Sequence, residues 1–154
     1  MFVPEDFEVP AHLSSEIFKF EVLEPGLSDS DYEAVMSSKE RLRQVFAEND
    51  EWPEDTMTYE FNKNDLLRHE SEFKAKEAFA YAVFNAAKDN YIGCVYINPT
   101  EYAGHDCEVY LWVKDSEQSL DKALFESVDD WLRREWPFKN IAYPGRTIAW
   151  SEWS

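Results

Sequence analysis

The spacing of apolar residues changes once along the chain, from a helical period to the period of strands. Between about residues 28 and 78, apolar side chains recur three and four positions apart, which is typical of amphipathic helices. From residue 79 onward, short apolar runs at 79–84, 91–97 and 107–113 are separated by polar, turn-forming segments. These runs predict an antiparallel meander of three strands, so we expect an α/β (α+β) domain.

A long amphipathic helix follows the third of these runs. Its apolar residues keep the three-and-four spacing along one face, with charged residues opposite: Leu120, Leu124, Val128, Trp131 and Leu132. Pro137 ends the helix, and residues 140–143 are predicted to form a last strand. A strand, a crossover helix and another strand predict a parallel pair with a right-handed connection.

Before the meander, the sequence predicts one strand and three helices. The strand covers residues 17–23 and ends at Pro25-Gly26, after an extended arm formed by residues 1–16. The predicted helices are one that starts with a capping box at Ser28 and ends near Ser37, a short one with Leu42, Val45 and Phe46, and one capped by Asn62 or Asn64 that ends near Ala78. With a short tail at 144–154, we expect residues 1–154 to form a single domain.

The chain is strongly acidic, with 32 Asp and Glu against 15 Lys and Arg and a formal net charge of -17. This charge excludes a generic nucleic-acid binder, which would need clustered basic residues. It favours cationic partners, although solubility alone is the simpler interpretation. The N-terminus has neither a basic start nor an apolar core, and no apolar run approaches the ~18 residues of a membrane span. We therefore expect a soluble, cytoplasmic protein with no membrane partner.

The cysteines and histidines do not indicate a metal or redox site. Cys94 and Cys107 both lie inside apolar runs, which is typical of buried, reduced thiols. His105, Asp106, Cys107 and Glu108 are consecutive, and because alternate residues of a strand point to opposite faces, the four side chains cannot converge on one ion. We therefore predict no metal.

The order of elements over residues 17–143 resembles the fold of the GCN5-related N-acetyltransferases. The run from Cys107 to Val113, CEVYLWV, is similar to the fourth strand of the ribosomal-protein-alanine acetyltransferase branch, which opens on Glu. The resemblance implies a mixed sheet with an antiparallel meander, a central parallel pair of strands that splay apart, and flanking helices. It also implies acetyl-CoA as co-substrate, bound where the parallel strands splay.

The resemblance assigns the contacts with acetyl-CoA to two short segments. The pantetheine arm would pair with the backbone near Leu111, Trp112 and Val113, and the pyrophosphate would meet the start of the following helix. The family pattern at that start is Gln or Arg, two residues, Gly, one residue, and Gly or Ala. It falls on the segment that contains Gln118, Ser119, Asp121, Lys122 and Ala123. Asp121 stands in place of the glycine, so either the backbone amides still bind the cofactor with help from nearby lysines, or the site is degenerate.

Two residues are candidates for the chemistry. Acetyl transfer to an amine needs the neutral amine, so an ammonium acceptor must first lose a proton. Glu108 lies where the resembling branch carries a catalytic carboxylate, and we expect it to be this base; a polar residue at an exposed strand end is the simpler interpretation. Tyr143 lies near the place of the family's tyrosine general acid, and we carry that role over to it.

Two functions follow from the resemblance and the charge. The leading hypothesis is an N-acetyltransferase that moves acetyl from acetyl-CoA to a small-molecule amine or an N-terminal amine, with a cationic small molecule preferred. The alternative is a catalytically inactive member of the fold that binds or regulates a basic protein. The aromatic segment 148–153 is able to form an extended strand, and its pairing either with the same sheet or with a second subunit in a homodimer is also open.

Overall fold

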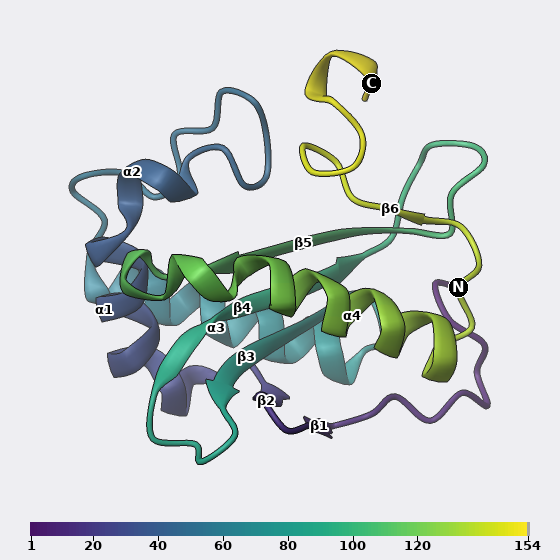
Figure 1. Ribbon diagram of the computed structural model, residues 1–154, viewed down its shortest axis with the longest axis horizontal. Helices are drawn as coiled ribbons and strands as arrows, with labels where there is room; N and C mark the ends of the chain where they lie inside the picture. Colours follow the sequence, from purple (N-terminus) through teal and green to yellow (C-terminus); the bar gives the residue numbers. More distant parts are fainter. Residues whose placement is uncertain (154) are drawn as a thin grey trace.

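A six-stranded sheet forms the centre of the computed structural model, which describes residues 1–153 (Figure 1). The strands lie side by side in chain order: β1 (His12–Ser14), β2 (Phe18–Val22), β3 (Phe79–Asn85), β4 (Tyr91–Asn98), β5 (Cys107–Val113) and β6 (Ile141–Ala142). Neighbouring strands from β1 to β5 are antiparallel, and β5 and β6 are parallel. The predicted fold class, with its meander and its parallel pair, is confirmed, although the pair lies at one edge of the sheet and not at its centre.

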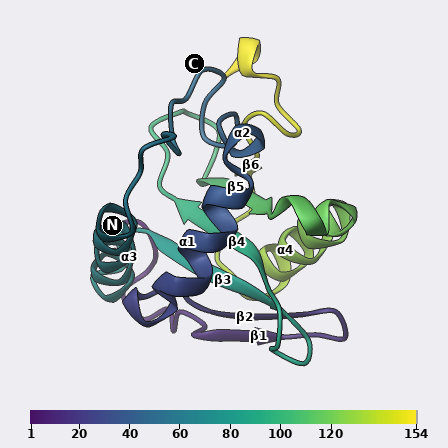
Figure 2. The same ribbon diagram turned by 90° about the vertical axis from the view of Figure 1, so that its left-hand side faces the viewer.

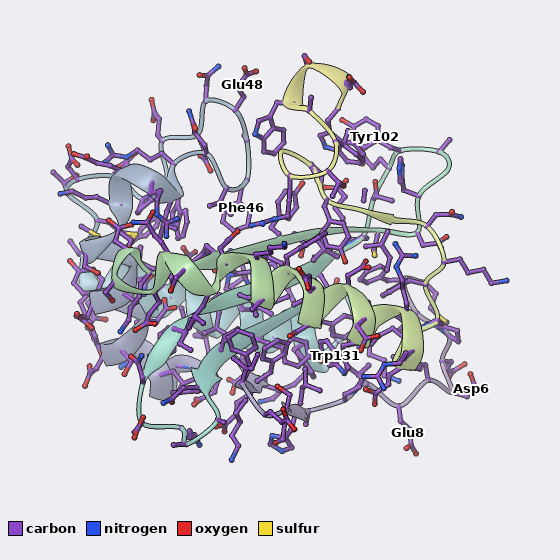
Figure 3. All side chains as sticks on the ribbon, viewed as in Figure 1. Asp6, Glu8, Phe46, Glu48, Tyr102 and Trp131 are labelled. Carbon is purple, nitrogen blue, oxygen red and sulfur yellow. The ribbon has the colours of Figure 1, made fainter. Side chains whose placement is uncertain are left out.

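Helices cover both faces of this sheet (Figure 2). On one face lie α1 (Ser28–Ser37) and α3 (Tyr59–Lys74), with the short α2 (Lys39–Leu42) beyond α1; on the other lies α4 (Asp121–Glu135), which connects β5 to β6. The central strands β3, β4 and β5 are buried on both faces, so their alternate residues enter two separate cores. Figure 3 shows Trp131 of α4 pointing into one of them, where its ring packs edge-on against Phe20 and Tyr81.

The predicted helix caps are wrong, although the helices themselves exist. Thr58 caps α3, because its hydroxyl accepts a hydrogen bond from the Phe61 N–H at 3.1 Å. Asn62, one of the predicted caps, is instead buried inside α3 and donates to Asp31 at 2.8 Å. The Ser28 hydroxyl donates to the Pro25 carbonyl at 2.6 Å and does not cap α1.

The N-terminal arm is a part of the fold. Residues 1–16 contain β1, which pairs with β2 from His12 to Ser14. Phe2 stacks between Phe79 and Phe138, with ring centroids 5.7 and 5.4 Å away. The arm therefore covers one end of the core under α4. Among residues 1–153, no helix combines the length and the apolarity that a bilayer span requires.

The C-terminal tail folds back onto its own domain. It forms a 3₁₀ turn at Trp150–Glu152, and the Trp153 ring lies 4.3 Å from the ring of Tyr102 in the β4–β5 loop. Gly145 has a φ of 76°, and a Cβ atom there would lie 2.4 Å from the Trp150 indole. The tail adds no strand to the six of the sheet within the part described.

Candidate active site

A cleft opens where β5 and β6 diverge. The two strands pair only at Cys107 with Ile141 and at Glu108 with Ala142. Beyond these pairs lies a cleft of about 370 Å³. Its walls are β5, the turn after β6, and the chain at and after α2: Val109, Tyr110, Leu111, Pro144, Gly145, Arg146, Arg41, Gln44 and Val45. The parallel pair is therefore splayed, as predicted.

Two arginines line this cleft, and the residues that line it include no carboxylate. Arg146 makes a bidentate ion pair with Asp121 of α4, at 2.7 and 3.0 Å, and its guanidinium lies over the Phe125 ring. Arg41 donates to the Val113 carbonyl and, at 2.9 Å, to Asp115. The cleft is therefore cationic, but both cations are held by aspartates that flank the segment between β5 and α4.

The predicted pantetheine contacts divide between the two faces of β5. Leu111 lines the cleft, and the Val113 carbonyl is already bound by Arg41. Trp112 is 1% exposed, and its indole N–H donates to the Tyr96 hydroxyl at 3.0 Å in the core on the α1–α3 face. The structure therefore brings Leu111 to the cleft but turns the Trp112 side chain away from it.

The segment predicted to hold the pyrophosphate is a 3₁₀ helix, Asp115–Leu120, which runs directly into α4. The Asp121 N–H donates to the Gln118 carbonyl, so the first backbone donor of α4 already has a partner. The Gln118 side chain donates to the Asp115 carbonyl at 3.2 Å, and Ser119 is exposed. This segment does not fit the open turn of free amides that the resemblance implied.

The lysines near this segment do not compensate for the missing glycine. Lys122 is 88% exposed and lies 3.8 Å from Glu126 on the same helix, while Lys114 donates to Asn90 at 3.0 Å. Neither lysine lines the cleft, and Ala123 packs against the core under α4. The cleft therefore fits a pantetheine arm along β5, whereas its positive charge comes from Arg41 and Arg146.

A second hollow, an acidic cavity of about 580 Å³, lies on the α1–α3 face of the sheet. Five carboxylates and one guanidinium line it: Asp31, Asp65, Glu72, Glu77, Glu108 and Arg68. Burial lowers the pKa of His69, which also lines the cavity, to about 4, so this ring is neutral at pH 7. Within residues 1–153, no three His, Cys, Asp or Glu side chains gather closely enough to hold a metal ion. The charge of the acidic cavity favours an organic cation.

Aromatic side chains close one wall of the acidic cavity. Phe46 comes from the loop after α2, and its ring lies 4.9 Å from Tyr96, 5.2 Å from Tyr110 and 5.4 Å from Trp52. Figure 3 shows Phe46 reaching from this loop toward the sheet, whereas Glu48 of the same loop points away from the molecule. The prediction that Phe46 belongs to a helix is wrong, because α2 ends at Leu42.

Glu108 and Tyr110 connect the two hollows. Glu108 lines the acidic cavity, Tyr110 lines the cleft, and the Tyr110 hydroxyl donates to the Glu108 carboxylate at 2.8 Å. Both side chains lie on the same face of β5, because they are two residues apart on a strand. The Glu108 carboxylate is thus oriented by a neighbour that reaches into the cleft.

Tyr143 lies on the opposite face of the sheet. Its ring packs edge-on against Phe125 of α4, and its hydroxyl donates to Asp129 at 2.8 Å. The structure therefore does not bring Tyr143 and Glu108 together. Sequence reasoning missed Tyr110, Arg41 and Arg146; the only signal for Tyr110 was its position two residues after Glu108.

The structure is similar to solved structures of other proteins, although its sequence is not. No protein-family model and no curated protein matches the sequence. The structure is similar to that of the ribosomal-protein-S5-alanine acetyltransferase from Vibrio fischeri, with a TM-score of 0.61 and 15% identity over 80% of this chain and 67% of the other.

Two further structures hold ligands. RimL, the ribosomal L7/L12 α-N-protein acetyltransferase in complex with coenzyme A, matches with a TM-score of 0.62 and 16% identity over 82% of this chain and 68% of its own. MccE, the microcin C7 self-immunity acetyltransferase in complex with acetyl-CoA and AMP, matches with a TM-score of 0.63 and 11% identity over 81% and 66%. The chain spans about two thirds of the length of each of these chains. It has the fold of the GCN5-related N-acetyltransferases.

Proposed function

We propose that the protein is an acetyl-CoA-dependent N-acetyltransferase with a cationic small-molecule amine as acceptor. One observation carries this proposal: two hollows of opposite charge adjoin β5, and the hydrogen-bonded pair of Glu108 and Tyr110 lies between them. The cleft with two arginines suits an anionic acetyl donor, and the acidic cavity suits a cationic acceptor.

Acetyl-CoA would occupy the cleft, because the cleft lies where the parallel strands β5 and β6 diverge. Two structures of the same fold hold coenzyme A or acetyl-CoA. Bound acetyl-CoA supplies an activated acetyl group as a thioester. In this chain, the backbone near Leu111 would hold the pantetheine arm, and Arg41 and Arg146 would face the phosphates once they leave Asp115 and Asp121.

Glu108 would prepare the acceptor. Its carboxylate lines the acidic cavity, where it would take a proton from the acceptor ammonium and leave a neutral amine for attack. One neighbouring structure, RimL, is named as the α-N-protein acetyltransferase of ribosomal L7/L12, so an N-terminal amine is the other acceptor to test. We prefer a small polycation, because five carboxylates surround one guanidinium in a cavity of about 580 Å³.

The first test is thermal unfolding with and without acetyl-CoA. A ligand at a hundred times its Kd stabilises a protein by about 2.7 kcal/mol, which is roughly 5–10 °C in a domain of this size. Thiol release is then measured with spermidine and with propylamine, which lacks additional charges; we expect the higher kcat/KM for spermidine. The absence of both a shift and turnover at millimolar acetyl-CoA would reject the enzyme and favour an inactive member of the fold that binds a basic protein.

A further inference from the structure

Tyr110 lines the cleft proposed for the acetyl donor, and its hydroxyl donates a hydrogen bond to Glu108, the predicted base. We propose that Tyr110 carries a proton from Glu108 to the departing thiol, a role that the family resemblance had assigned to Tyr143. This inference rests on the proposed function and names a residue that completes its chemistry.

Packing and a hydrogen bond hold the Tyr110 side chain in place. It is 8% exposed, its ring packs 5.2 Å from Phe46, and its hydroxyl donates to Glu108 at 2.8 Å. Burial and the hydrogen bond to Glu108 raise the pKa of Tyr110, so the hydroxyl keeps its proton at neutral pH. A protonated phenol at the wall of the cleft is placed to donate.

The proton balance closes with these two residues. Glu108 takes one proton from the acceptor ammonium, and the amine nitrogen then bonds to the thioester carbonyl carbon. As the carbon–sulfur bond breaks and its electron pair stays on sulfur, Tyr110 gives the sulfur its proton and regains one from Glu108 along the hydrogen bond. The nitrogen loses its second proton to water as the amide forms, so Glu108 and Tyr110 both return to their starting states.

Tyr143 has no comparable path to the reaction. Its hydroxyl is bound to Asp129 of α4, on the face of the sheet opposite Glu108. Both tyrosines lie on or beside the splayed strands, and both donate a hydrogen bond to a carboxylate at 2.8 Å. Replacing each by Phe therefore removes the same group from the two faces and compares the two assignments directly.

The test measures acetyl transfer to spermidine by the wild type, Tyr110→Phe and Tyr143→Phe across pH. With acetyl-CoA, we expect Tyr110→Phe to lower kcat by about 100-fold across the pH range of the assay, which is a typical contribution of general acid–base catalysis. The stabilisation by acetyl-CoA in thermal unfolding should be unchanged, because no donor contact is lost.

A donor with a better leaving group separates proton transfer from a structural defect. S-(4-nitrophenyl) thioacetate releases 4-nitrothiophenol, whose low thiol pKa lets the sulfur leave without a proton from an acid. Tyr110→Phe should therefore recover most of its activity with this donor. A wild-type rate for Tyr110→Phe with acetyl-CoA, a loss that persists with the activated donor, or a loss confined to Tyr143→Phe would each overturn the assignment while leaving an active wild type. A wild type without any transfer would overturn the proposed function as well.

Discussion

At the scale of single residues, the proposed function depends on one carboxylate at the start of β5, that of Glu108. Glu108→Gln keeps the shape of the side chain and removes the proton acceptor. We expect it to lower kcat at pH 7 by about 100-fold and to leave the thermal shift with acetyl-CoA nearly unchanged. Steady-state kinetics with spermidine provide the measurement, and Glu135→Gln, which changes an exposed residue at the end of α4, provides the matched control. Equal activity in Glu108→Gln would remove it from the mechanism.

A second residue-scale effect concerns the buried Asp31 in α1. It is 3% exposed and accepts hydrogen bonds from Tyr91 at 2.6 Å, Asn62 at 2.8 Å and Cys94 at 3.4 Å. Burial raises the pKa of Asp31 above its ordinary value of 3.8; these three hydrogen bonds lower it, and the nearby Asp65 raises it further. The net direction is upward, so the folded protein holds this proton more tightly than the unfolded chain.

The sign of the pH dependence follows from that direction. The stability linked to this proton is complete below pH 3.8 and is lost as the pH rises through the raised pKa of Asp31. Asp31→Asn has no such proton, so its free energy of unfolding should improve relative to the wild type as the pH rises above about 4. Urea unfolding of both proteins at several pH values measures the difference. A difference that is constant with pH would show that folding leaves the pKa of Asp31 unchanged, and one that moves in the opposite direction would show that folding lowers it.

At the scale of elements, the aspartates at the start of the 3₁₀ segment and at the start of α4 pair with the two arginines that line the cleft. Asp121 neutralises Arg146 from the position where the family pattern has glycine. Asp121→Asn should free the guanidinium and tighten coenzyme A binding about fivefold, which corresponds to roughly 1 kcal/mol. Isothermal calorimetry measures this change. Asp130→Asn on the same helix, which breaks the exposed pair with Arg134, is the control for charge alone.

The gain in affinity from Asp121→Asn should depend on the phosphates of coenzyme A. Pantetheine carries no phosphate, so its affinity should be the same for the wild type and Asp121→Asn. An equal gain in Asp130→Asn would mean that the effect is long-range electrostatics. No gain in Asp121→Asn would mean that the phosphates do not approach Arg146.

The sequence predicted well those elements in which burial produces a continuous run of apolar residues within one short segment. The runs 79–84, 91–97 and 107–113 became β3, β4 and β5, because their residues are buried on both faces. β1 was missed because three residues beside Pro10 carry too short a pattern to read. The start of α3 was misplaced because Thr58 follows a loop with no apolar period.

The candidate site was less predictable, because its contacts join distant parts of the chain. Glu108 followed from the resemblance, but Arg146 reaches Asp121 across 25 positions and Arg41 reaches Asp115 across 74. No local spacing indicates such pairs; they form because α4 connects the splayed strands and α2 covers their open end. Tyr110 lay within reach of a local rule, since residues two apart on a strand share a face.

At the scale of the whole molecule, the net charge of -17 would attract the proposed cationic acceptor. Salt screens such a field, with a Debye length of ~10 Å at 0.1 M. Raising NaCl from about 20 to 300 mM should therefore increase KM for spermidine severalfold and that for propylamine much less, with kcat nearly constant. Initial rates at four salt concentrations test this. Parallel changes for the two amines would show that the charge serves solubility alone.

The acidic cavity would also affect the release of the acetylated product. Acetylation converts an ammonium into an amide, which is neutral at every physiological pH. The product would therefore lose part of the attraction that drew the substrate toward the five carboxylates, whereas fresh polycation keeps it in full. The cavity would discriminate between the two by charge, so product would leave without a moving lid and would inhibit weakly even as it accumulates.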